Sequence, residues 1–363
     1  MAKFEKLKLP SYGQMPGVAF HCSDMQMSSS GPRVLIFGGQ RQGISGALYS
    51  FEQSSGDGFL LMPDGIEGSG PPPAQRTQST LTSVGEEPQE VLLLFAGFVL
   101  NVGCVNDLWK VTISLDLASM PVPSWEQLEP SGTPPEPRYG HSATLLKGGL
   151  IAVIGGQDTV IQFNDVHLLT ADGSAWSKPE ISGTLPSVRM RHTANAVGPS
   201  QVLIFGGFNK TDRVLSDCFR LELSGKDSGS WTTCYPEAPA GSKSIPPRAQ
   251  HAASCTNDNK FLFIFGGYDG AKPLNDLWLL DINAMALKNV GVEPPAPEPR
   301  SRHSMHMIGD SLHVFAGYDG SKPVAGDVYT LDCSDPGGME GTEAGGGDGK
   351  KEEKKKADDD DED

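Results

Sequence analysis

Residues 248–278 read RAQHAASCTNDNKFLFIFGGYDGAKPLNDLW, and this stretch holds the pattern that decides the fold. An Arg-x-x-His motif comes first, then a run of apolar residues that ends at a Gly-Gly pair, and finally Asn-Asp-Leu-Trp. The apolar run has the length of a strand, and the glycine pair marks a bend or a close approach of two backbones at its end. We therefore expect short buried β-strands here rather than a helix.

Pairs of small residues of the same kind occur six times along the chain. They are Gly38-Gly39, Ala96-Gly97, Gly155-Gly156, Gly206-Gly207, Gly266-Gly267 and Ala316-Gly317. The intervals between them are 58, 59, 51, 60 and 50 residues. A period of about 50 residues, with a strand that ends in Gly-Gly, is typical of propeller blades. The six pairs predict six blades that pack in a ring, because one blade cannot bury both of its faces alone.

Other motifs recur in phase with these pairs. Upstream lie Arg138…His141, Arg189…His192, Arg248…His251 and Arg300…His303, with Arg76…Ser79 in the second repeat and only His21 in the first. Downstream lie the aspartates Asp107, Asp165, Asp217, Asp276 and Asp327, each two residues before an aromatic residue or histidine. After three of these units, Trp125, Trp176 and Trp231 are each expected to open a further short strand.

This combination resembles the kelch repeat over residues 1 to about 334. The resemblance implies an all-β fold, a six-bladed kelch β-propeller. Proline-rich stretches before the arginines make the chain similar to the free-standing six-blade kelch proteins, such as the Rab-binding kelch effector. We expect two parts, a propeller at residues 1–334 and a disordered acidic C-terminal tail at residues 335–363.

The sixth repeat ends at Leu331-Asp332-Cys333 and has no tryptophan strand after it. We expect the missing strand at the N-terminus, because Phe4-Glu5-Lys6-Leu7 resembles Trp125-Glu126-Gln127-Leu128 of the second repeat. Residues 4–9 are thus predicted to form the N-terminal outer strand that closes the ring. A frayed N-terminus is the alternative.

Acidic residues give the chain a net charge of −16. Residues 335–363 carry twelve acidic residues and five lysines, so this tail contributes −7 and the rest of the chain −9. An acidic body repels phosphate, so we expect no nucleic-acid partner. The Gly/Lys/Asp-rich tail cannot form a packed core, which predicts disorder. Such a tail either only solubilises the protein, or contacts a basic partner or the propeller's own arginines.

The expected location is cytoplasmic, without membrane insertion. The first ten residues are charged and lack the apolar segment of a signal peptide. The longest strongly apolar stretch, residues 91–100, is too short to span a bilayer. The six cysteines show no CxxC spacing, which favours reduced thiols.

No part of the sequence carries a recognised catalytic motif. HExxH, cysteine–histidine zinc spacing, G-x-S-x-G and the P-loop are all missing. The repeated Arg-x-x-His units are expected to make the same structural hydrogen bonds in every blade, because a catalytic site needs one asymmetric constellation. The repeated aspartates are expected at turns and strand entries. We therefore expect no catalytic residue, no metal and no cofactor.

The resemblance to kelch adaptors implies a binding face made of loops at one end of the ring. Residues directly after the small pairs recur there, as do residues directly before the motif histidine. The second class holds Phe20, Gln78, Gly140, Arg191, Gln250 and Arg302. From the two classes, the expected partner-binding residues are Arg191, Arg302, Tyr268, Tyr318, Phe208, Phe98, Gln40, Gln157 and Gln250.

This set of residues favours a protein partner. Arginine and aromatic side chains dominate the energy of protein interfaces. Arg191 and Arg302 can hold a carboxylate bidentately, and the neighbouring loops add Lys210, Arg213, Lys272 and Lys322. The partner is expected to present an acidic peptide or a C-terminal carboxylate.

The sequence thus predicts a monomeric protein–protein interaction scaffold or adaptor. Two alternatives stay open, because the fold does not define the function. One is a small-molecule enzyme or specifier protein with its site in the central mouth, since some kelch relatives are enzymes or act with iron. The other is a cytoskeletal, actin-associated kelch protein.

Overall fold

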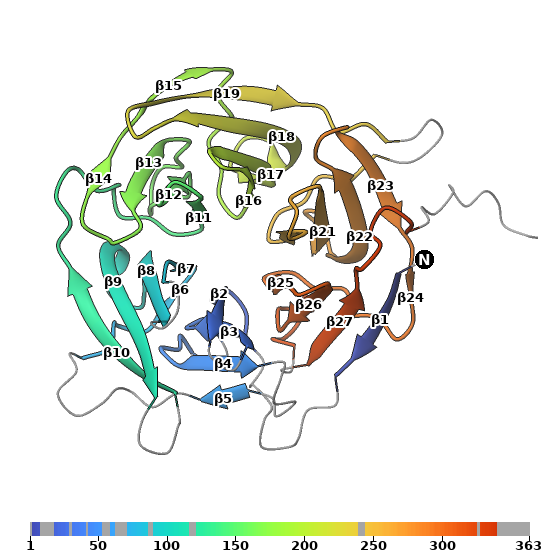
Figure 1. Cartoon of the computed structure of the whole chain (residues 1–363), viewed down its shortest axis with the longest axis horizontal. Coiled ribbons are helices and arrows are strands. Elements are labelled where there is room, and N and C mark those ends of the chain that lie inside the picture. Colours follow the sequence, from blue (N-terminus) through green and yellow to red (C-terminus); the bar gives the residue numbers. More distant parts are fainter. Residues whose placement is uncertain are drawn as a thin grey trace, which may run out of the picture.

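The computed structural model describes residues 2–7, 18–28, 31–40, 43–52, 59–61, 71–85, 90–115, 121–238, 244–324 and 327–339. Within these ranges, every regular secondary-structure element is a β-strand, and the strands form six sheets. The sheets stand around a common centre, and the chain passes through them in sequence order (Figure 1). The prediction of an all-β, six-bladed propeller is confirmed. We number the sheets blades 1 to 6 along the chain.

Blades 1 to 3 follow one another through the first half of the chain. Blade 1 contains β2 (Cys22–Ser28), β3 (Gly31–Phe37), β4 (Leu48–Glu52) and β5 (Phe59–Leu61). Blade 2 contains β6 (Arg76–Thr77), β7 (Thr80–Ser83), β8 (Glu90–Val99), β9 (Gly103–Leu115) and β10 (Pro121–Leu128). Blade 3 contains β11 (Ser142–Leu146), β12 (Leu150–Ile154), β13 (Val166–Thr170) and β14 (Trp176–Ser177).

Blades 4 to 6 repeat this plan with additions at their outer edges. Blade 4 contains β16 (Thr193–Gly198), β17 (Gln201–Asn209), β18 (Arg213–Ser224) and β19 (Ser228–Cys234), with β15 (Glu180–Gly183) parallel to β19. Blade 5 contains β20 (Ala252–Cys255), β21 (Phe261–Tyr268), β22 (Pro273–Asp281) and β23 (Ala286–Val290). Blade 6 contains β25 (Ser304–Ile308), β26 (Ser311–Phe315) and β27 (Val328–Asp332), extended by β1 (Ala2–Lys6) and β24 (Val292–Glu293).

The N-terminal strand closes the ring as the sequence predicts, although it begins two residues earlier than expected. β1 pairs antiparallel with β27, and Phe4 lies opposite Leu331. Phe4 is 0% exposed, and its ring lies 5.6 Å from that of Phe265 in blade 5. In Figure 1, β1 lies on the outer side of β27, and β24 lies beyond it at the edge of blade 6. Of the predicted strand, residues 8 and 9 lie outside the described residues.

The core lies between neighbouring blades. The second and third strands of each blade are buried on both faces, which explains why their apolar residues run consecutively rather than alternate with polar ones. The innermost strands contact one another around the centre. The predicted fourth strands are present, since Trp125, Trp176 and Trp231 lie in β10, β14 and β19 and are buried. Trp176 opens its strand as expected, whereas β10 and β19 begin four and three residues before their tryptophans.

The small-residue pairs bring the end of each second strand close to the Arg-x-x-His segment at the start of the same blade. Gly207 has φ +105°, and a Cβ there would lie 2.9 Å from the Cβ of His192. A larger residue would therefore meet both backbone strain and a clash. The pairs mark one end of the ring, which we call the loop face.

Beyond the last strand, Met339 packs partly buried against the core of blades 5 and 6. The amine of Lys288 donates a hydrogen bond to the carbonyl of Gly337 at 3.2 Å. The remainder of the predicted tail, residues 340–363, lies outside the described residues, and the division at residue 334 stays a prediction. In the parts of the chain that the structure describes, no helix has the length and apolar character to cross a membrane.

Candidate functional site

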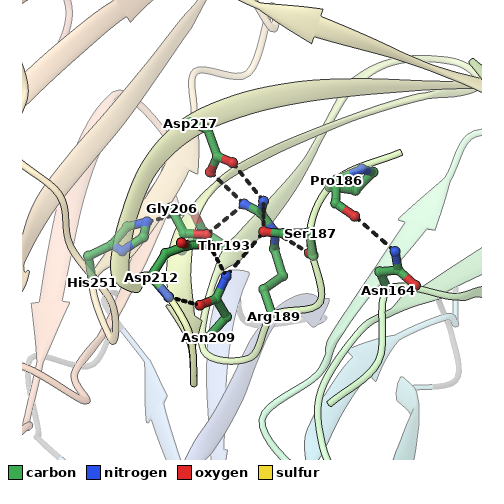
Figure 2. A network of polar contacts seen from close by, with 10 residues as sticks. All are labelled: Asn164, Pro186, Ser187, Arg189, Thr193, Gly206, Asn209, Asp212, Asp217 and His251. Carbon is green, nitrogen blue, oxygen red and sulfur yellow. Dashed lines mark hydrogen bonds and ion pairs between the residues drawn. The ribbon is translucent and has the colours of Figure 1, made fainter. Parts of the chain in front are cut away.

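The arginine of each Arg-x-x-His motif clamps its own blade together. The Arg189 guanidinium donates to both carboxylate oxygens of Asp217, at 2.7 and 2.8 Å, and to the carbonyl of Gly206 at 3.0 Å (Figure 2). The same contacts recur at Arg76–Asp107, Arg138–Asp165 and Arg248–Asp276. These arginines are 0–1% exposed. The guanidinium thus links the segment before the first strand to the end of the second strand and to the third strand.

The expectation that the repeated aspartates lie at turns and strand entries fits blade 3, whose aspartate directly precedes β13, but is wrong for blades 2, 4 and 5, whose aspartates lie inside the third strand. In all four blades the carboxylate is the counter-ion of a buried arginine. Blade 6 differs, because Asp327 pairs with Lys6 of the closing strand at 2.7 Å. Arg300 keeps its bond to the carbonyl of Ala316 at 3.0 Å. The ion pair of Asp327 with Lys6 thus connects the N-terminal strand to blade 6.

The motif histidines join each blade to the one before it. In His141, His192 and His251, Nε2 lies 2.9 Å from the hydroxyl of Thr80, Ser142 and Thr193, respectively. His21 closes the series with Ser304 of blade 6 at 3.0 Å. In blade 2 a serine replaces the histidine, and Ser79 lies 3.4 Å from the Cys22 sulfur of blade 1. The prediction that these repeated residues make structural hydrogen bonds is confirmed.

His303 is the exception among these histidines. Its preceding blade has Ala252 where the others have a hydroxyl, so His303 lacks the side-chain hydrogen bond that the other motif histidines make. Burial lowers the pKa of His303 to about 3 and that of His141 and His192 likewise to about 3. Because neutral imidazole is the better buried form, all of these rings are uncharged at neutral pH.

The residues before the motif histidine form the rim of the central mouth. All six have left-handed backbone, with φ between 56° and 67° at Phe20, Gln78, Gly140, Arg191, Gln250 and Arg302. Only one is glycine, and each of the others accepts a strain of about 1 kcal/mol or more. Backbone hydrogen bonds of 2.7–3.0 Å connect each of them to the next around the ring, from Phe20 to Arg302. This annulus fixes the strained conformation and places the five side chains and the glycine around one cavity of about 140 Å³.

The residues after the small pairs lie beside this rim. In every blade, the residue directly after the small pair forms a β-bridge with a residue of the motif segment. That residue lies two positions before the motif histidine or its equivalent, as in Met190–Phe208 and Ser301–Tyr318. The two position classes therefore neighbour each other on the loop face, as the kelch resemblance implies.

Six of the nine predicted binding residues surround one pocket of about 390 Å³ on the loop face of blades 4, 5 and 6. They are Arg191, Phe208, Gln250, Tyr268, Arg302 and Tyr318. All six are half-buried, so each presents part of its side chain to solvent. The pocket combines two cations with three aromatic rings, the residue types that anchor protein interfaces.

The two arginines of this pocket are held in place from behind. Arg191 Nε donates to the Gln78 amide oxygen at 2.8 Å, and Arg302 Nε donates to the Gln250 amide oxygen at 2.9 Å. The Phe20 ring centroid lies 5.1 Å from the Arg191 Cζ and 3.9 Å from the Arg302 Cζ. Unlike the motif arginines of blades 2 to 5, neither forms an ion pair with a described carboxylate.

The two positive charges act on each other. Burial and the charge of Arg302 lower the pKa of Arg191 to about 10. Burial lowers the pKa of Arg302 as well. Both arginines stay protonated at neutral pH, although their charges are incompletely hydrated and repel each other. An anion in the pocket would offset both unfavourable energies.

The other three predicted residues lie on blades 1 to 3 and do not line this pocket. Gln157 is 8% exposed and bonds the Tyr139 hydroxyl. Phe98 stacks edge-on against Tyr139 at 5.8 Å, and Gln40 is exposed. Conversely, Phe20 and Gln78 support the arginines but are not among the nine. Their position directly before the motif histidine, or before its equivalent Ser79, is the sequence feature that could have identified them as rim residues.

No metal site emerges in the described ranges, where no group of three His, Cys, Asp or Glu side chains is placed to hold an ion. The ring of six blades, with arginine clamps inside blades 2 to 5 and histidine links between blades, defines the architecture of a kelch propeller. The family described as the KLHDC2/KLHL20/DRC7 Kelch-repeats domain matches residues 7–207 and 191–340. The chain belongs to this kelch-repeat family.

The chain is also similar to parts of proteins that differ widely from one another. The chain is 31% identical over 239 residues to the flagellar outer-arm dynein alpha chain of Chlamydomonas reinhardtii, covering 63% of this chain and 5% of that protein. It is 34% identical over 198 residues to tip elongation aberrant protein 1 of Schizosaccharomyces pombe, covering 53% and 16%. It is 28% identical over 200 residues to the human Rab9 effector protein with kelch motifs, covering 53% and 51%. The chain thus spans about half or less of each of these relatives.

Proposed function

We propose that this propeller is a protein–protein interaction scaffold whose loop-face pocket, on blades 4 to 6, binds a carboxylate-bearing segment of a partner protein. The observation that carries the proposal is the pair Arg191 and Arg302. Their Nε atoms are used by glutamines, which leaves the terminal nitrogens of both guanidinium groups for a ligand. Two such forks suit a carboxylate, which they can bind bidentately.

The partner is an acidic peptide or the C-terminal carboxylate of a chain. Phe208, Tyr268 and Tyr318 would pack against the apolar parts of that segment. Lys210, Arg213, Lys272 and Lys322 would add long-range attraction from the adjacent loops, within a protein whose overall charge is −16. The positive mouth disfavours basic partners, and the acidic body disfavours nucleic acid.

A partner of protein size also fits the rest of the loop face. Leu100 and Val102 of blade 2 are 57% and 71% exposed, and Val160 and Ile161 of blade 3 are 71% and 53% exposed. The amide of Gln162 donates to the carbonyl of Phe208 at 3.4 Å, which connects these loops to the pocket. A small anion would leave this apolar surface uncovered.

Action by binding rather than catalysis is part of the proposal. The repeated histidines, which are the side chains best suited to acid–base chemistry, are engaged in structural contacts in blade after blade, as are the repeated arginines. A monomeric state and a cytoplasmic location also belong to it. The six free thiols support the location, because reducing compartments keep cysteines in this form.

Fluorescence anisotropy with labelled peptides tests the site. The probes are an acidic peptide with a free C-terminus, its C-terminal amide, and a neutral peptide with a free C-terminus. The variant Arg191→Gly with Arg302→Gly removes both guanidinium groups at positions where Gly140 shows that glycine fits. The matched control, Lys178→Ala with Lys226→Ala, removes two exposed charges from the outer edges of blades 3 and 4.

We expect the wild type and the lysine control to bind the acidic or the free-carboxylate probes, and the glycine variant to bind them at least about tenfold more weakly. The amide and neutral probes separate an acidic segment from a C-terminal carboxylate. Equal affinity of all three proteins for every probe would rule out this pocket as the binding site.

A further inference from the structure

Two of the six free cysteines lie directly opposite each other in blade 4. Cys218 belongs to β18 and Cys234 to β19, and these antiparallel strands align the two residues as Cα partners. Facing residues in an antiparallel pair have Cα atoms about 4.5 to 5.5 Å apart and side chains on the same side of the sheet. Disulfides need Cα separations of about 4.4 to 6.8 Å. The backbone therefore already meets the distance requirement for a disulfide.

The two thiols differ in access to solvent. Cys218 is 0% exposed and belongs to the core between blades 4 and 5. Cys234 is half-buried at the end of β19 and packs against the edge of that core. A small oxidant can reach Cys234, whereas Cys218 is reached through Cys234.

A cation lies on the same face of β18. Arg220 is two residues from Cys218, so the two side chains project to one side of the strand. Arg220 Nη2 donates to the carbonyl of Ile282 in blade 5 at 3.0 Å, while its buried Nε has no hydrogen-bond partner. The guanidinium thus has donor capacity and positive charge to stabilise a nearby thiolate.

The electrostatics of the pair follow from these contacts. A hydrogen bond from Cys218, helped by the charge of Arg220 and opposed by burial, lowers the pKa of Cys234 to about 7. The same hydrogen bond, together with burial, raises the pKa of Cys218. Cys234 therefore supplies a thiolate at neutral pH, and Cys218 remains a protonated thiol beside it.

We propose that Cys218 and Cys234 are a reversible thiol-oxidation site, in which Cys234 reacts with a hydroperoxide and Cys218 resolves the product to a cross-strand disulfide. A low-pKa, accessible cysteine beside a second thiol is the arrangement that peroxide-sensing sites use. This site does not depend on the carboxylate pocket or on any partner.

The chemistry balances with hydrogen peroxide as the oxidant. The Cys234 sulfur attacks one peroxide oxygen, the O–O bond breaks, and the products are a sulfenic acid and one water. The Cys218 sulfur then displaces the hydroxyl group from Cys234, which forms the S–S bond and releases a second water. The two thiols lose two electrons and two protons, and these reduce the peroxide.

The other cysteines do not share this environment. Burial raises the pKa of each of them, to about 12 for Cys22, Cys255 and Cys333, and to a lesser extent for Cys104. As thiols rather than thiolates they react slowly with peroxide. Oxidation is therefore expected at one pair out of six cysteines.

The test treats the full-length protein with hydrogen peroxide, blocks remaining thiols with N-ethylmaleimide under denaturing conditions and maps the peptides by mass spectrometry. We expect the Cys218 and Cys234 peptides to be linked, with a mass decrease of about 2 Da that dithiothreitol reverses. Cys234→Ser should leave Cys218 fully alkylated, and Cys104→Ser should behave like the wild type. Cys218→Ser should accumulate a sulfenic acid at Cys234, detected with dimedone.

Peptide mapping of the wild type decides the question even if a variant folds poorly. The proposal is overturned if the peroxide-treated wild type keeps both thiols alkylatable. It is equally overturned if the linkage involves other cysteines, or if Cys234→Ser loses the Cys218 thiol at the rate of the wild type.

Discussion

The arginine clamps make a quantitative prediction, because blade 5 has the buried ion pair and blade 6 has an exposed one at the equivalent aspartate. Asp276 receives two hydrogen bonds from Arg248, at 2.8 and 2.7 Å, and Arg248 is 0% exposed. Asp327 instead pairs with Lys6, and these side chains are 31% and 47% exposed. Asp276→Asn and Asp327→Asn are therefore matched changes with different expected costs.

Removing one partner of a buried pair costs about 3–5 kcal/mol, since the other charge stays buried without compensation. The Asp276 side chain is 25% exposed and asparagine keeps one acceptor, so we expect the lower end, about 3 kcal/mol. An exposed pair contributes about 0–1 kcal/mol, so Asp327→Asn should cost less than about 1 kcal/mol. Urea denaturation followed by tryptophan fluorescence measures both free energies of unfolding.

The double variant Arg248→Met with Asp276→Leu serves as the control. Because no uncompensated charge is left behind, it should be more stable than Asp276→Asn despite carrying two substitutions. Equal losses for Asp276→Asn and Asp327→Asn, or a double variant less stable than the single one, would refute the interpretation of the clamp as a buried ion pair.

Three further predictions concern closure, the rim and pH. Phe4→Ala should cost about 3–5 kcal/mol in unfolding free energy, because the ring is fully buried in the closing strand; a loss below 1 kcal/mol, measured by urea denaturation, would contradict closure by β1. Arg191→Gly with Arg302→Gly should change stability by no more than about 1 kcal/mol per site, because relief of left-handed strain offsets the added freedom of glycine; a calorimetric loss well above that would make these arginines structural. The free energy of unfolding should fall as pH drops below 6.5, because burial lowers the pKa values of six histidines in the folded protein. The unfolded chain therefore binds their protons first, and each histidine lowers the free energy of unfolding by about 1.4 kcal/mol per pH unit. Asp24, whose pKa burial raises to about 6, opposes this with one proton, so equal urea midpoints at pH 7.5 and 5.5 would contradict the account.

The blades could be predicted from sequence because they are local and repeated. Each small-residue pair ends a run of buried residues, and the repeat of the pattern shows how many such units exist. The closing strand was also within reach, since Phe4 fills the place that Trp125 fills in blade 2. Its bounds were less certain, because short strands at a chain end carry little pattern of their own.

The role of the aspartates was not predictable in the same way. Asp217 lies 28 residues from Arg189, and an aspartate between two strands looks like any turn residue. Only the fold brings the third strand under the guanidinium. Cys218 and Cys234 are a similar case, because their spacing fits no motif and their contact depends on the register of β18 with β19.

The candidate site was predicted in its positions but not in its asymmetry. Sequence alignment of the repeats places the same two position classes in all six blades. Which of these residues share a pocket depends on side-chain size and on how Gln78 and Gln250 hold the arginines. The pocket on blades 4 to 6 is thus a product of differences between blades, which a repeat pattern averages out.

Quantitative affinity purification with three forms of the full-length protein tests whether the arginine pocket binds partner proteins. The forms are the wild type, Arg191→Gly with Arg302→Gly, and the control Lys178→Ala with Lys226→Ala. We expect the wild type and the lysine control to retain specific partner proteins and the glycine variant to lose them, although its stability differs from that of the wild type by no more than about 1 kcal/mol per site. Retention of the same partners in the same amounts by all three would contradict the claim that the arginine pocket on the loop face is the binding site.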